Sequence, residues 1–272
     1  MTQQPSTTPR RLTVVDTTAL GPRLRRITLS GRDLQDFPAA GPGAHIKLFV
    51  PRPGQEPLLP TRGAKGLSWP PGERPAVRTY SLRGHDPERG TVAVEFVLHG
   101  DDGPASRWAA RAQAGDPIGL AGPGGPPLYD ADADFHLLAG DLSALPAIAA
   151  VLEALPATAR GAALVEIADA DDQQSLSHPP GVQLRWLHAS TPSADEPALA
   201  AALREVDWPA TARVSATVAG ENAAVIAIRR QLLFDRGLPR AAVYAVPYWR
   251  RGDSEERYHE DRHRIMDEAS SP

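Results

Sequence analysis

The first half of the chain has a hydrophobic pattern typical of short β-strands. Between about Arg11 and Gly122, apolar and polar positions alternate over short runs that are separated by glycine and proline. In TVAVEFVLH, every second residue from Val92 to Leu98 is apolar, which places these side chains on one face of a half-buried strand. Many short strands of this kind predict an antiparallel barrel or sandwich.

A second pattern begins near Phe135. The run FHLLAGD is continuously apolar, as in a strand buried on both faces, and ALPAIAAVLEAL has helical spacing. Strand-like and helix-like runs then alternate up to AAVYAVPYW, and the helical run that begins at Asn222 stops at Gly237. This alternation predicts parallel strands joined by helical crossovers, an open Rossmann-like α/β sheet.

A segment rich in glycine, proline and acidic residues, Ala121–Asp134, separates the two patterns. We therefore predict one domain over residues 1–130 and a second over residues 131–272. The proline-rich stretch Pro51–Pro75 is predicted to be a surface loop without a regular strand ladder. The polar end, Arg250–Pro272, is expected to form a solvated helix followed by a frayed tail.

Composition narrows the classes of function. The 272 residues hold 29 Lys and Arg against 33 Asp and Glu, a net charge of −4, which disfavours nucleic acid as a partner. There is no cysteine, so any redox chemistry would need an organic cofactor or a substrate metal. The sequence has no leader-like start and no run of roughly 20 apolar residues, so we expect a cytoplasmic, monomeric protein without a membrane span.

The run AVRTYSLRG, Ala76–Gly84, places polar side chains where Val or Ile would pack better. Its centre, Arg78-Thr79-Tyr80-Ser81, resembles the Arg-x-Tyr-Ser/Thr flavin signature of ferredoxin-reductase-like flavoenzymes. On a strand, Arg78 and Tyr80 point to the same side, where a guanidinium can pair with the FAD diphosphate and a phenol can lie against the isoalloxazine. Taken alone, four such residues are equally compatible with an ordinary half-exposed strand.

The segment that follows agrees with the flavin interpretation. Gly103-Pro104-Ala105-Ser106-Arg107 is predicted to open a helix, and the free N–H groups and positive dipole end of a helix start favour a phosphate. The alternative is an ordinary helix start, with Pro104 in the first turn and Asp102 as the cap.

These runs, together with PGAHIKLFVP, LLAGDLSALPAIAAVLEALP, VEIADADDQQ, WLH and YWRRG, resemble the siderophore-interacting protein family from about Arg11 to Tyr258. Its members are FAD-containing ferric-siderophore reductases. The resemblance implies a six-stranded FAD-binding barrel, an NAD(P)H-binding α/β domain and a flavin between them. It implies hydride transfer from NAD(P)H to FAD, then single electrons to the Fe(III) of a siderophore, and no general acid or nucleophile. Fe(II) would leave because hard catecholate oxygens hold it weakly.

The resemblance assigns the flavin to two segments of the predicted barrel. Arg78, Tyr80 and Ser81 would hold the flavin, with Thr79 between them, and Ser81 would bind near its N5/O4 edge. The diphosphate and adenosine end would lie against a loop and a helix start that comprise His99, Gly100, Gly103, Ala105 and Ser106. A lone histidine such as His99 is more often a structural hydrogen-bonding residue.

In the second domain, the resemblance points to the carboxyl ends of the strands, where open α/β sheets bind ligands. The candidates for the nicotinamide dinucleotide are Gly140, Asp141, Ser143, Ala144, Asp169, Gly220 and Glu221. The GxGxxG spacing of the Rossmann fingerprint is absent, and glycines and acids at strand ends are also ordinary turn residues. Trp249, with Tyr248, could line the flavin or could belong to the core.

Two cationic side chains bear on the choice between NADPH and NADH. Arg185 and His188 flank the WLH strand and could lie near a ribose 2′-phosphate. Ala189 follows, where the family is expected to have arginine, so the choice of nucleotide stays open.

For the substrate, the resemblance implies a bulky anionic, catecholate-like ferric siderophore, which a positive pocket would attract. Lys47 of HIKL, next to His45, and Arg250 and Arg251 of YWRRG are the candidate residues. Lys47 could equally be a solvent-facing strand residue.

The tail contains HEDRH, His259–His263, which formally matches a zinc-peptidase pattern. A zinc hydrolase would need a buried helix and a third ligand, and only nine residues follow His263, so no metal site is expected. The alternative function with more support is a general NAD(P)H:flavin oxidoreductase, of the diaphorase kind, with no preference for siderophores.

Overall fold

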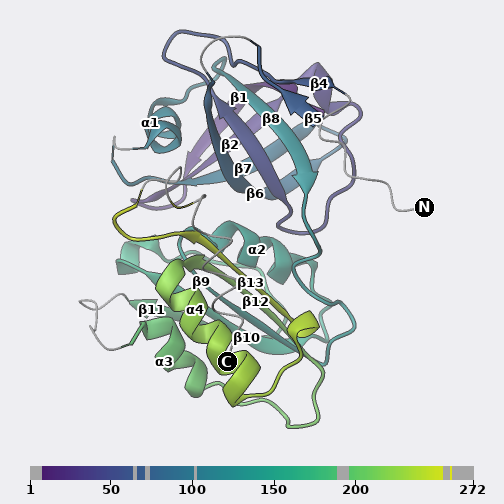
Figure 1. Cartoon of the computed structure of the whole chain (residues 1–272), viewed down its shortest axis with the longest axis vertical. Helices are drawn as coiled ribbons and strands as arrows, with labels where there is room; N and C mark the ends of the chain where they lie inside the picture. Colours follow the sequence, from purple (N-terminus) through teal and green to yellow (C-terminus); the bar gives the residue numbers. More distant parts are fainter. Residues whose placement is uncertain are drawn as a thin grey trace. The chain divides into compact units, whose positions relative to one another are not determined.

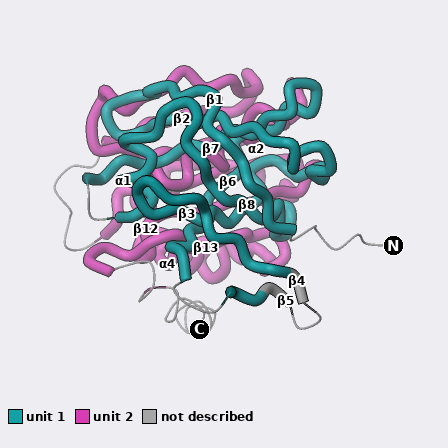
Figure 2. The backbone as a smooth tube through the Cα atoms, turned by 90° about the horizontal axis from the view of Figure 1, so that it is seen from above, with its two compact units in different colours: residues 1–127 teal, residues 128–272 magenta. Residues whose placement is uncertain are grey.

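The computed structural model describes residues 8–63, 66–70, 74–100, 103–188, 196–253 and Tyr258. The chain forms two compact units, residues 1–127 and 128–272 (Figure 2). Each unit has its own hydrophobic core, one built from barrel strands and the other from a sheet and its helices.

The first unit is a closed antiparallel barrel in the strand order β1–β2–β7–β6–β3–β8 (Figure 1). Its strands are β1 (Arg10–Ala19), β2 (Leu24–Ser30), β3 (His45–Val50), β6 (Ala76–Asp86), β7 (Thr91–Val97) and β8 (Pro117–Gly124). The pairing of β8 with β1 closes the barrel, so no edge is left unpaired. The predicted six-stranded barrel is confirmed.

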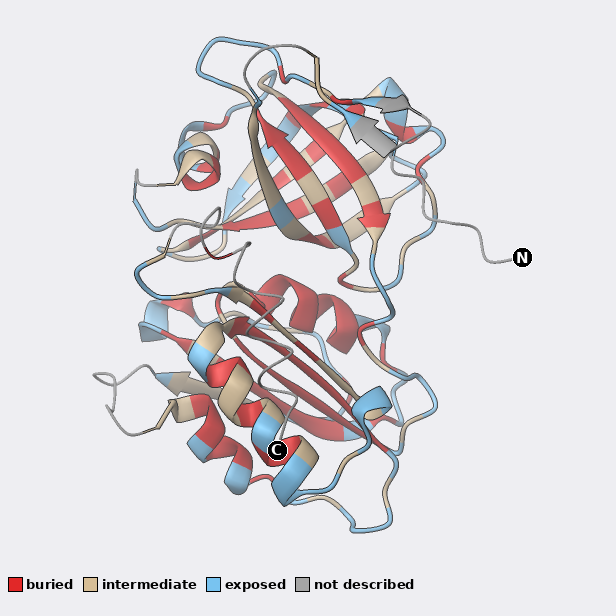
Figure 3. Cartoon of the chain, in the orientation of Figure 1, coloured by how far each residue is buried: buried red, intermediate tan, exposed pale blue. Residues whose placement is uncertain are grey.

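The alternating sequence pattern forms this barrel because one face of each strand is buried. Val92, Val94 and Phe96 of β7 point inward, opposite Leu29, Ile27 and Arg25 of β2, respectively. Buried and partly buried positions alternate along the barrel strands in Figure 3.

Two shorter elements stand beside the barrel. The helix α1 (Pro104–Arg111) packs Trp108 and Ala109 against the barrel core, and the 3-10 turn η1 (Arg32–Leu34) buries Leu34. Within the proline-rich stretch, β4 (Thr61–Gly63) and β5 (Gly66–Ser68) form a small antiparallel ladder. The prediction that Pro51–Pro75 holds no regular ladder is therefore wrong. The run between Pro60 and Pro70 contains no proline and is long enough for two short paired strands.

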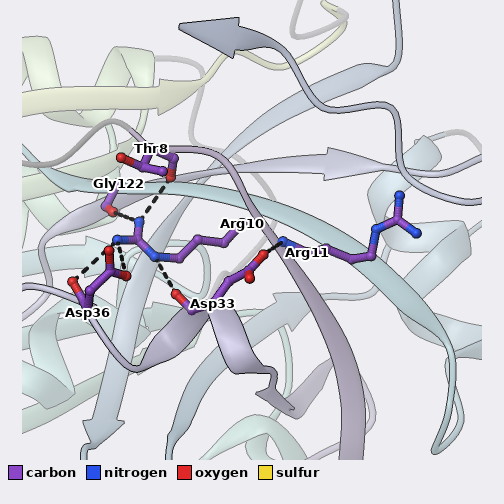
Figure 4. A network of polar contacts seen from close by, with 6 residues as sticks. All are labelled: Thr8, Arg10, Arg11, Asp33, Asp36 and Gly122. Carbon is purple, nitrogen blue, oxygen red and sulfur yellow. Dashed lines mark hydrogen bonds and ion pairs between the residues drawn. The ribbon is translucent and has the colours of Figure 1, made fainter.

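A buried arginine ties the start of β1 to the turn η1 and to β8 of the same unit (Figure 4). The side chain of Arg10 is 1% exposed, and its guanidinium donates to the carbonyl oxygens of Asp33 (2.8 Å), Thr8 (2.9 Å) and Gly122 (3.2 Å). It also forms an ion pair with Asp36 at 3.2 Å. Because a guanidinium has five N–H donors in a rigid fork, one side chain serves all these acceptors.

The second unit is an open sheet of five parallel strands in the order β11–β10–β9–β12–β13 (Figure 1). These are β9 (Phe135–Asp141), β10 (Arg160–Ile167), β11 (Gly181–His188), β12 (Val214–Glu221) and β13 (Val243–Trp249). The central strands are buried along their length in Figure 3, which explains their continuous apolar runs. The predicted open parallel α/β sheet is confirmed.

Helices cover both faces of this sheet. Leu199 of α3 (Ala198–Arg204) and Ile228 of α4 (Asn222–Arg230) pack in one cluster with Leu137 of β9. The helix α2 (Leu145–Ala154) lies on the opposite face, beside Gly140, which alternates with Leu137 and Ala139.

Shorter turns complete this unit. They are the 3-10 turns η2 (Ala170–Asp172) and η4 (Arg240–Ala242) and the π-turn η3 (Gln231–Asp235), which continues α4. The helical run ends before Gly237, as predicted. The expected C-terminal polar helix lies almost entirely outside the described residues. In the part of the chain that the structure describes, no helix is long and apolar enough to cross a membrane.

Candidate functional site

The Arg-x-Tyr-Ser run lies in β6, paired with β3. Tyr80 is half-buried, and its ring lies 4.6 Å from the ring of Phe96, centroid to centroid. Phe96 in turn lies 5.6 Å from Trp108 of α1. Arg78 lies on the same face of the strand and donates to the carbonyl oxygen of Val77 at 3.0 Å. Tyr80 therefore joins an aromatic row that leads from β6 to α1.

The other side of the same strand carries a different set of side chains. Thr79 lies opposite Lys47, whose ammonium donates to the Thr79 hydroxyl at 2.5 Å, and Ser81 lies opposite His45. Ser81 is buried, whereas Thr79 and His45 are exposed. Because strand side chains alternate, Lys47 lies on the face of β3 and β6 away from Arg78 and Tyr80.

The predicted diphosphate loop is held by Ser106. Its hydroxyl accepts from the backbone N–H of His99 at 3.1 Å and donates to the carbonyl oxygen of Gly100 at 3.0 Å. The side chain is only 1% exposed. The hydroxyl of Ser106 thus shapes the loop from inside, next to Gly103 and Pro104, which are partly exposed.

Gly103 lies in close contact with the side chain of His99. A Cβ at this position would lie 2.8 Å from Cε1 of His99, so the imidazole rests directly on the glycine backbone. His99 itself is exposed. The structure therefore brings together four of the predicted residues at the start of α1, namely His99, Gly100, Gly103 and Ser106.

The start of α1 fits a phosphate. Gly103 is the N-cap residue, and no side chain among the described residues caps the helix or places an acid in its first turn. The first intrahelical bond runs from the N–H of Arg107 to Gly103, so the N–H groups of Ala105 and Ser106 precede it. Uncapped N–H groups at the positive end of a helix dipole suit the diphosphate of FAD.

In the second unit, Asp141 at the end of β9 collects four hydrogen bonds. Oδ1 accepts from the backbone N–H (2.8 Å) and hydroxyl (2.5 Å) of Ser143, and Oδ2 accepts from the backbone N–H of Glu221 (2.7 Å) and from Nε1 of Trp249 (2.8 Å). Asp141 therefore links the carboxyl ends of β9, β12 and β13. We call Asp141, Ser143, Glu221 and Trp249 the Asp141 clasp.

Gly220 is part of the same packing. Its φ of +123° lies in the region that favours glycine, and a Cβ would meet Oδ2 of Asp141 at 2.7 Å. Because glycine has no Cβ, the carboxylate of Asp141 can pack against the backbone of Gly220. Gly140, the other predicted glycine, lies against Ala144 and Ala219. Both glycines serve internal packing in this structure, which accounts for their presence without a GxGxxG fingerprint.

Carboxylates dominate this edge of the sheet. Burial raises the pKa of Asp141, and the hydrogen bonds from Ser143 and Trp249 oppose that rise. Burial also raises the pKa of Glu166, which pairs with Asp141 in register, and the charge of Asp141 adds to it. Glu166 is not among the predicted site residues, although it stands near the end of the second predicted strand.

Glu221 caps the next helix. Its Oε2 accepts from the N–H groups of Ala223 (2.6 Å) and Ala224 (3.3 Å), and its Oε1 accepts from the N–H of Arg251 at 3.4 Å. The start of α4 is thus satisfied internally. By contrast, no described side chain caps α2, whose N-cap residue is Ala144.

The other predicted nucleotide residues have partners within the unit. The carboxylate of Asp169 accepts from the N–H of Asp171 at 3.1 Å and begins η2. Arg185 forms an ion pair with Glu205 at 2.7 Å, and Nε2 of His188 lies 3.2 Å from Nε2 of Gln173. The Arg185 pair is partly exposed, and such surface pairs contribute about 0–1 kcal/mol, so a phosphate could compete for this arginine. Ala189 lies outside the described residues.

The candidate substrate arginines differ from each other. Arg250 forms an ion pair with Asp253 and lies 5.7 Å from the centroid of the Tyr258 ring. Arg251 is exposed, and its charge opposes the rise in the pKa of Glu166 that burial causes. Trp249 is 39% exposed although its indole is clasped by Asp141, and Tyr248 is half-buried. The HEDRH run lies outside the described residues, and within those residues no group of three side chains could hold a metal ion.

A closed antiparallel barrel followed by an open parallel α/β sheet is the fold of the ferredoxin-reductase-like class. Two family models match the chain, "siderophore-interacting FAD-binding domain" over residues 13–127 and "siderophore-interacting protein" over residues 133–252. The chain belongs to the siderophore-interacting protein family, and the predicted resemblance is confirmed.

Several relatives are similar to this chain over nearly its full length. The chain is 42% identical to the ferric vibriobactin reductase of Vibrio cholerae over 96% of both chains. It is 34% identical to the NADPH-dependent ferric-chelate reductase of Escherichia coli, over 88% of this chain and 92% of that one. The solved structure of the siderophore-interacting protein SipS from Aeromonas hydrophila matches with a TM-score of 0.83 at 38% identity, covering 95% of this chain and 98% of that one.

These comparisons bear on the cofactor. The family model of the first unit is that of an FAD-binding domain, and the Escherichia coli relative is named an NADPH-dependent reductase. The prediction of an FAD-containing oxidoreductase supplied by NAD(P)H is confirmed at the level of the family.

Proposed function

We propose that this protein is a ferric-siderophore reductase that passes electrons from NAD(P)H through FAD to the Fe(III) of a siderophore. The observation that carries the proposal is its 42% identity to a ferric vibriobactin reductase, over 96% of both chains. Bound FAD would supply the chemistry that accepts two electrons together and releases them one at a time. Iron enters as substrate, and Fe(II) leaves because hard oxygen ligands hold it weakly.

The chain's own residues would bind and orient the cofactor. The N–H groups at the start of α1 would hold the diphosphate, with the Ser106 hydroxyl fixing the loop, and Arg78 would add a bidentate positive charge. Tyr80 would offer its accessible ring surface to the flavin, supported from behind by Phe96. Thr79, Ser81, His99 and Gly100 complete the proposed flavin site.

For the nucleotide, we propose the carboxyl edge of the parallel sheet, beside the uncapped start of α2. The Asp141 clasp would shape this edge. The ligand would contact what the clasp leaves accessible, including the exposed part of Trp249. Arg185 and His188 are the candidates for a 2′-phosphate, and NADPH is the proposed donor because the Escherichia coli relative is named NADPH-dependent.

The proposed substrate is an anionic, catecholate-like ferric siderophore. Lys47 and Arg251 are the cations proposed to attract it, whereas the charge of Arg250 is offset by Asp253. A monomeric state and a cytoplasmic location remain predictions. Gel filtration with light scattering tests the first, and cell fractionation tests the second.

The purified protein tests the whole proposal. It should be yellow, lose its flavin absorbance under anaerobic NAD(P)H and regain it when ferric siderophores are added from a panel. A colourless protein without affinity for FAD after reconstitution would overturn the proposal. Reoxidation by ferricyanide and quinones with no preference for siderophore iron would assign the protein to the general NAD(P)H:flavin oxidoreductases instead.

A further inference from the structure

Arg25 occupies a position in β2 that its strand pattern gives to the barrel interior. Leu29 and Ile27 point inward at every second residue, and Arg25 continues this series. Its partner in register on β7 is Phe96, which is fully buried. An arginine at such a position is costly unless its charged head is hydrogen-bonded.

The guanidinium of Arg25 is held by the C-terminal end of α1. Nη1 donates to the carbonyl oxygens of Ala109 (3.0 Å) and Ala110 (2.7 Å), and Nη2 donates to the carbonyl oxygen of Ala112 (3.0 Å). The same Nη2 donates to the hydroxyl of Thr17 on β1 at 2.8 Å. The last carbonyl groups of a helix have no partner within the helix, so Arg25 satisfies three of the acceptors at this end of α1.

The helix α1 contacts the barrel with small side chains and one indole. Its buried residues are Ala105, Ser106 and Ala109, whose side chains are small and bury little surface, and Trp108 is half-buried. Polar contacts therefore hold the helix at both ends. At the N-terminal end Ser106 binds the loop, and at the C-terminal end Arg25 binds the carbonyl groups.

The charge of Arg25 also matches the helix dipole. A cation at the C-terminal end complements the negative pole, just as an anion at the N-terminal end complements the positive pole. The helix α1 thus lies between a built-in cation at one end and the proposed diphosphate at the other. A rigid fork that spans three carbonyl groups fixes the position of the helix in a way that a single ammonium would not.

We propose that Arg25 is a positioning residue for FAD: it holds α1 on the barrel so that the N–H groups at the opposite end of the helix meet the diphosphate. This inference rests on the proposed placement of the diphosphate at the start of α1. It predicts that Arg25 affects ligands that carry the adenosine diphosphate part of FAD and leaves binding of the flavin ring unchanged.

The test compares the affinities of the full-length apoprotein for FAD and for riboflavin, which lacks the diphosphate. In Arg25→Met, the Kd for FAD should rise by about tenfold or more, because three charge-assisted hydrogen bonds that place the helix are lost. The Kd for riboflavin should stay within about twofold of wild type. Arg89→Met is the matched control, since Arg89 is 83% exposed in the same unit, and it should change neither value.

Arg25→Lys keeps the charge without the fork and serves if Arg25→Met does not fold. It should weaken FAD binding by several-fold and leave riboflavin unchanged. Unchanged FAD affinity in the folded variants would overturn the inference, as would a parallel loss for FAD and riboflavin, because that marks a general structural role. If wild type itself binds FAD no more tightly than riboflavin, the proposed diphosphate site fails instead.

Discussion

At the residue scale, the position of Asp141 in the sheet suggests ligand binding, and its hydrogen bonds show a structural role. Its place after the first strand of the parallel sheet makes it a natural candidate for a nucleotide site. In the structure both of its oxygens accept hydrogen bonds from the chain itself, from Ser143, Glu221 and Trp249. A carboxylate that is satisfied in this way contributes to the shape of this edge of the sheet.

Asp141→Asn should lower the free energy of unfolding by about 1–3 kcal/mol, because the amide nitrogen is a donor and would face donors in the Asp141 clasp. Urea denaturation measures this loss. Asp207→Asn, at an exposed position in the same unit, is the control and should change stability little. Equal stability of Asp141→Asn and wild type would contradict the role of the clasp.

Glu166 makes a pH-dependent contribution whose sign follows from its surroundings. Burial and the charges of Asp141 and Glu221 raise its pKa above 4.5, while Arg251 and a backbone hydrogen bond from Leu199 oppose the rise. A raised pKa in the folded state means that the stabilising contribution is present below pH 4.5 and is lost as the pH rises through the folded value.

Glu166→Gln should therefore be more stable than wild type at pH 7.5, and this gain should shrink as the pH falls toward 4.5. Urea denaturation of both proteins at several pH values measures the difference. A gain that does not vary with pH would show that the charge of Glu166 is not the cause.

At the scale of elements, two arginine side chains join parts of the barrel unit that are not neighbours in the sequence. Arg10 joins the start of β1 to the turn at Asp33 and to Gly122 at the end of β8. Arg25 joins β2 to α1 in a similar way. Most partners of both arginines are backbone carbonyl groups, so these contacts are set by the path of the chain and not by the identity of the partner side chains.

Arg10→Met should lower the free energy of unfolding by roughly 2–4 kcal/mol, because it removes three hydrogen bonds and an ion pair made by a buried guanidinium. Arg11→Met is a matched control at the neighbouring position. Arg11 is half-exposed and pairs with Glu56 at the surface, so its loss should cost about 0–1 kcal/mol. Thermal or chemical denaturation that finds equal losses would contradict the role assigned to Arg10.

At the scale of the whole molecule, the proposed function needs a cofactor site and, separately, positively charged side chains that attract the substrate. Arg78, proposed for the cofactor, and Lys47, proposed for the substrate, lie on opposite faces of the paired strands β6 and β3. Changes on the two faces should therefore have different kinetic effects.

Arg78→Ala should weaken retention of FAD, which gel filtration followed by the absorbance ratio of flavin to protein measures. Lys47→Ala should keep FAD bound and raise the KM for an anionic ferric siderophore by several-fold, because one attractive charge is lost. An unchanged KM in Lys47→Ala would remove Lys47 from the proposed substrate site, and full FAD retention in Arg78→Ala would remove Arg78 from the cofactor site.

The sequence by itself determined the two architectures and the family. Alternation of period two predicts the barrel, continuous apolar runs between helices predict the parallel sheet, and the Arg78–Ser81 run indicates the flavin. Local periodicity is enough here because it decides which face of each element is buried. The β4–β5 ladder was not predicted, because its strands have only three residues each and lie in a proline-rich stretch.

Only the tertiary structure decided which polar groups meet. Arg25 and Ala112 are far apart in the chain, as are Asp141 and Trp249, and each pair is joined by strand register and helix placement. Hydrophobic periodicity contains no information about these pairings, because a buried polar side chain bonds whichever donor or acceptor the fold brings to it. For that reason the sequence pointed to Asp141 as a ligand-binding residue, and the fold made it a link between three strands.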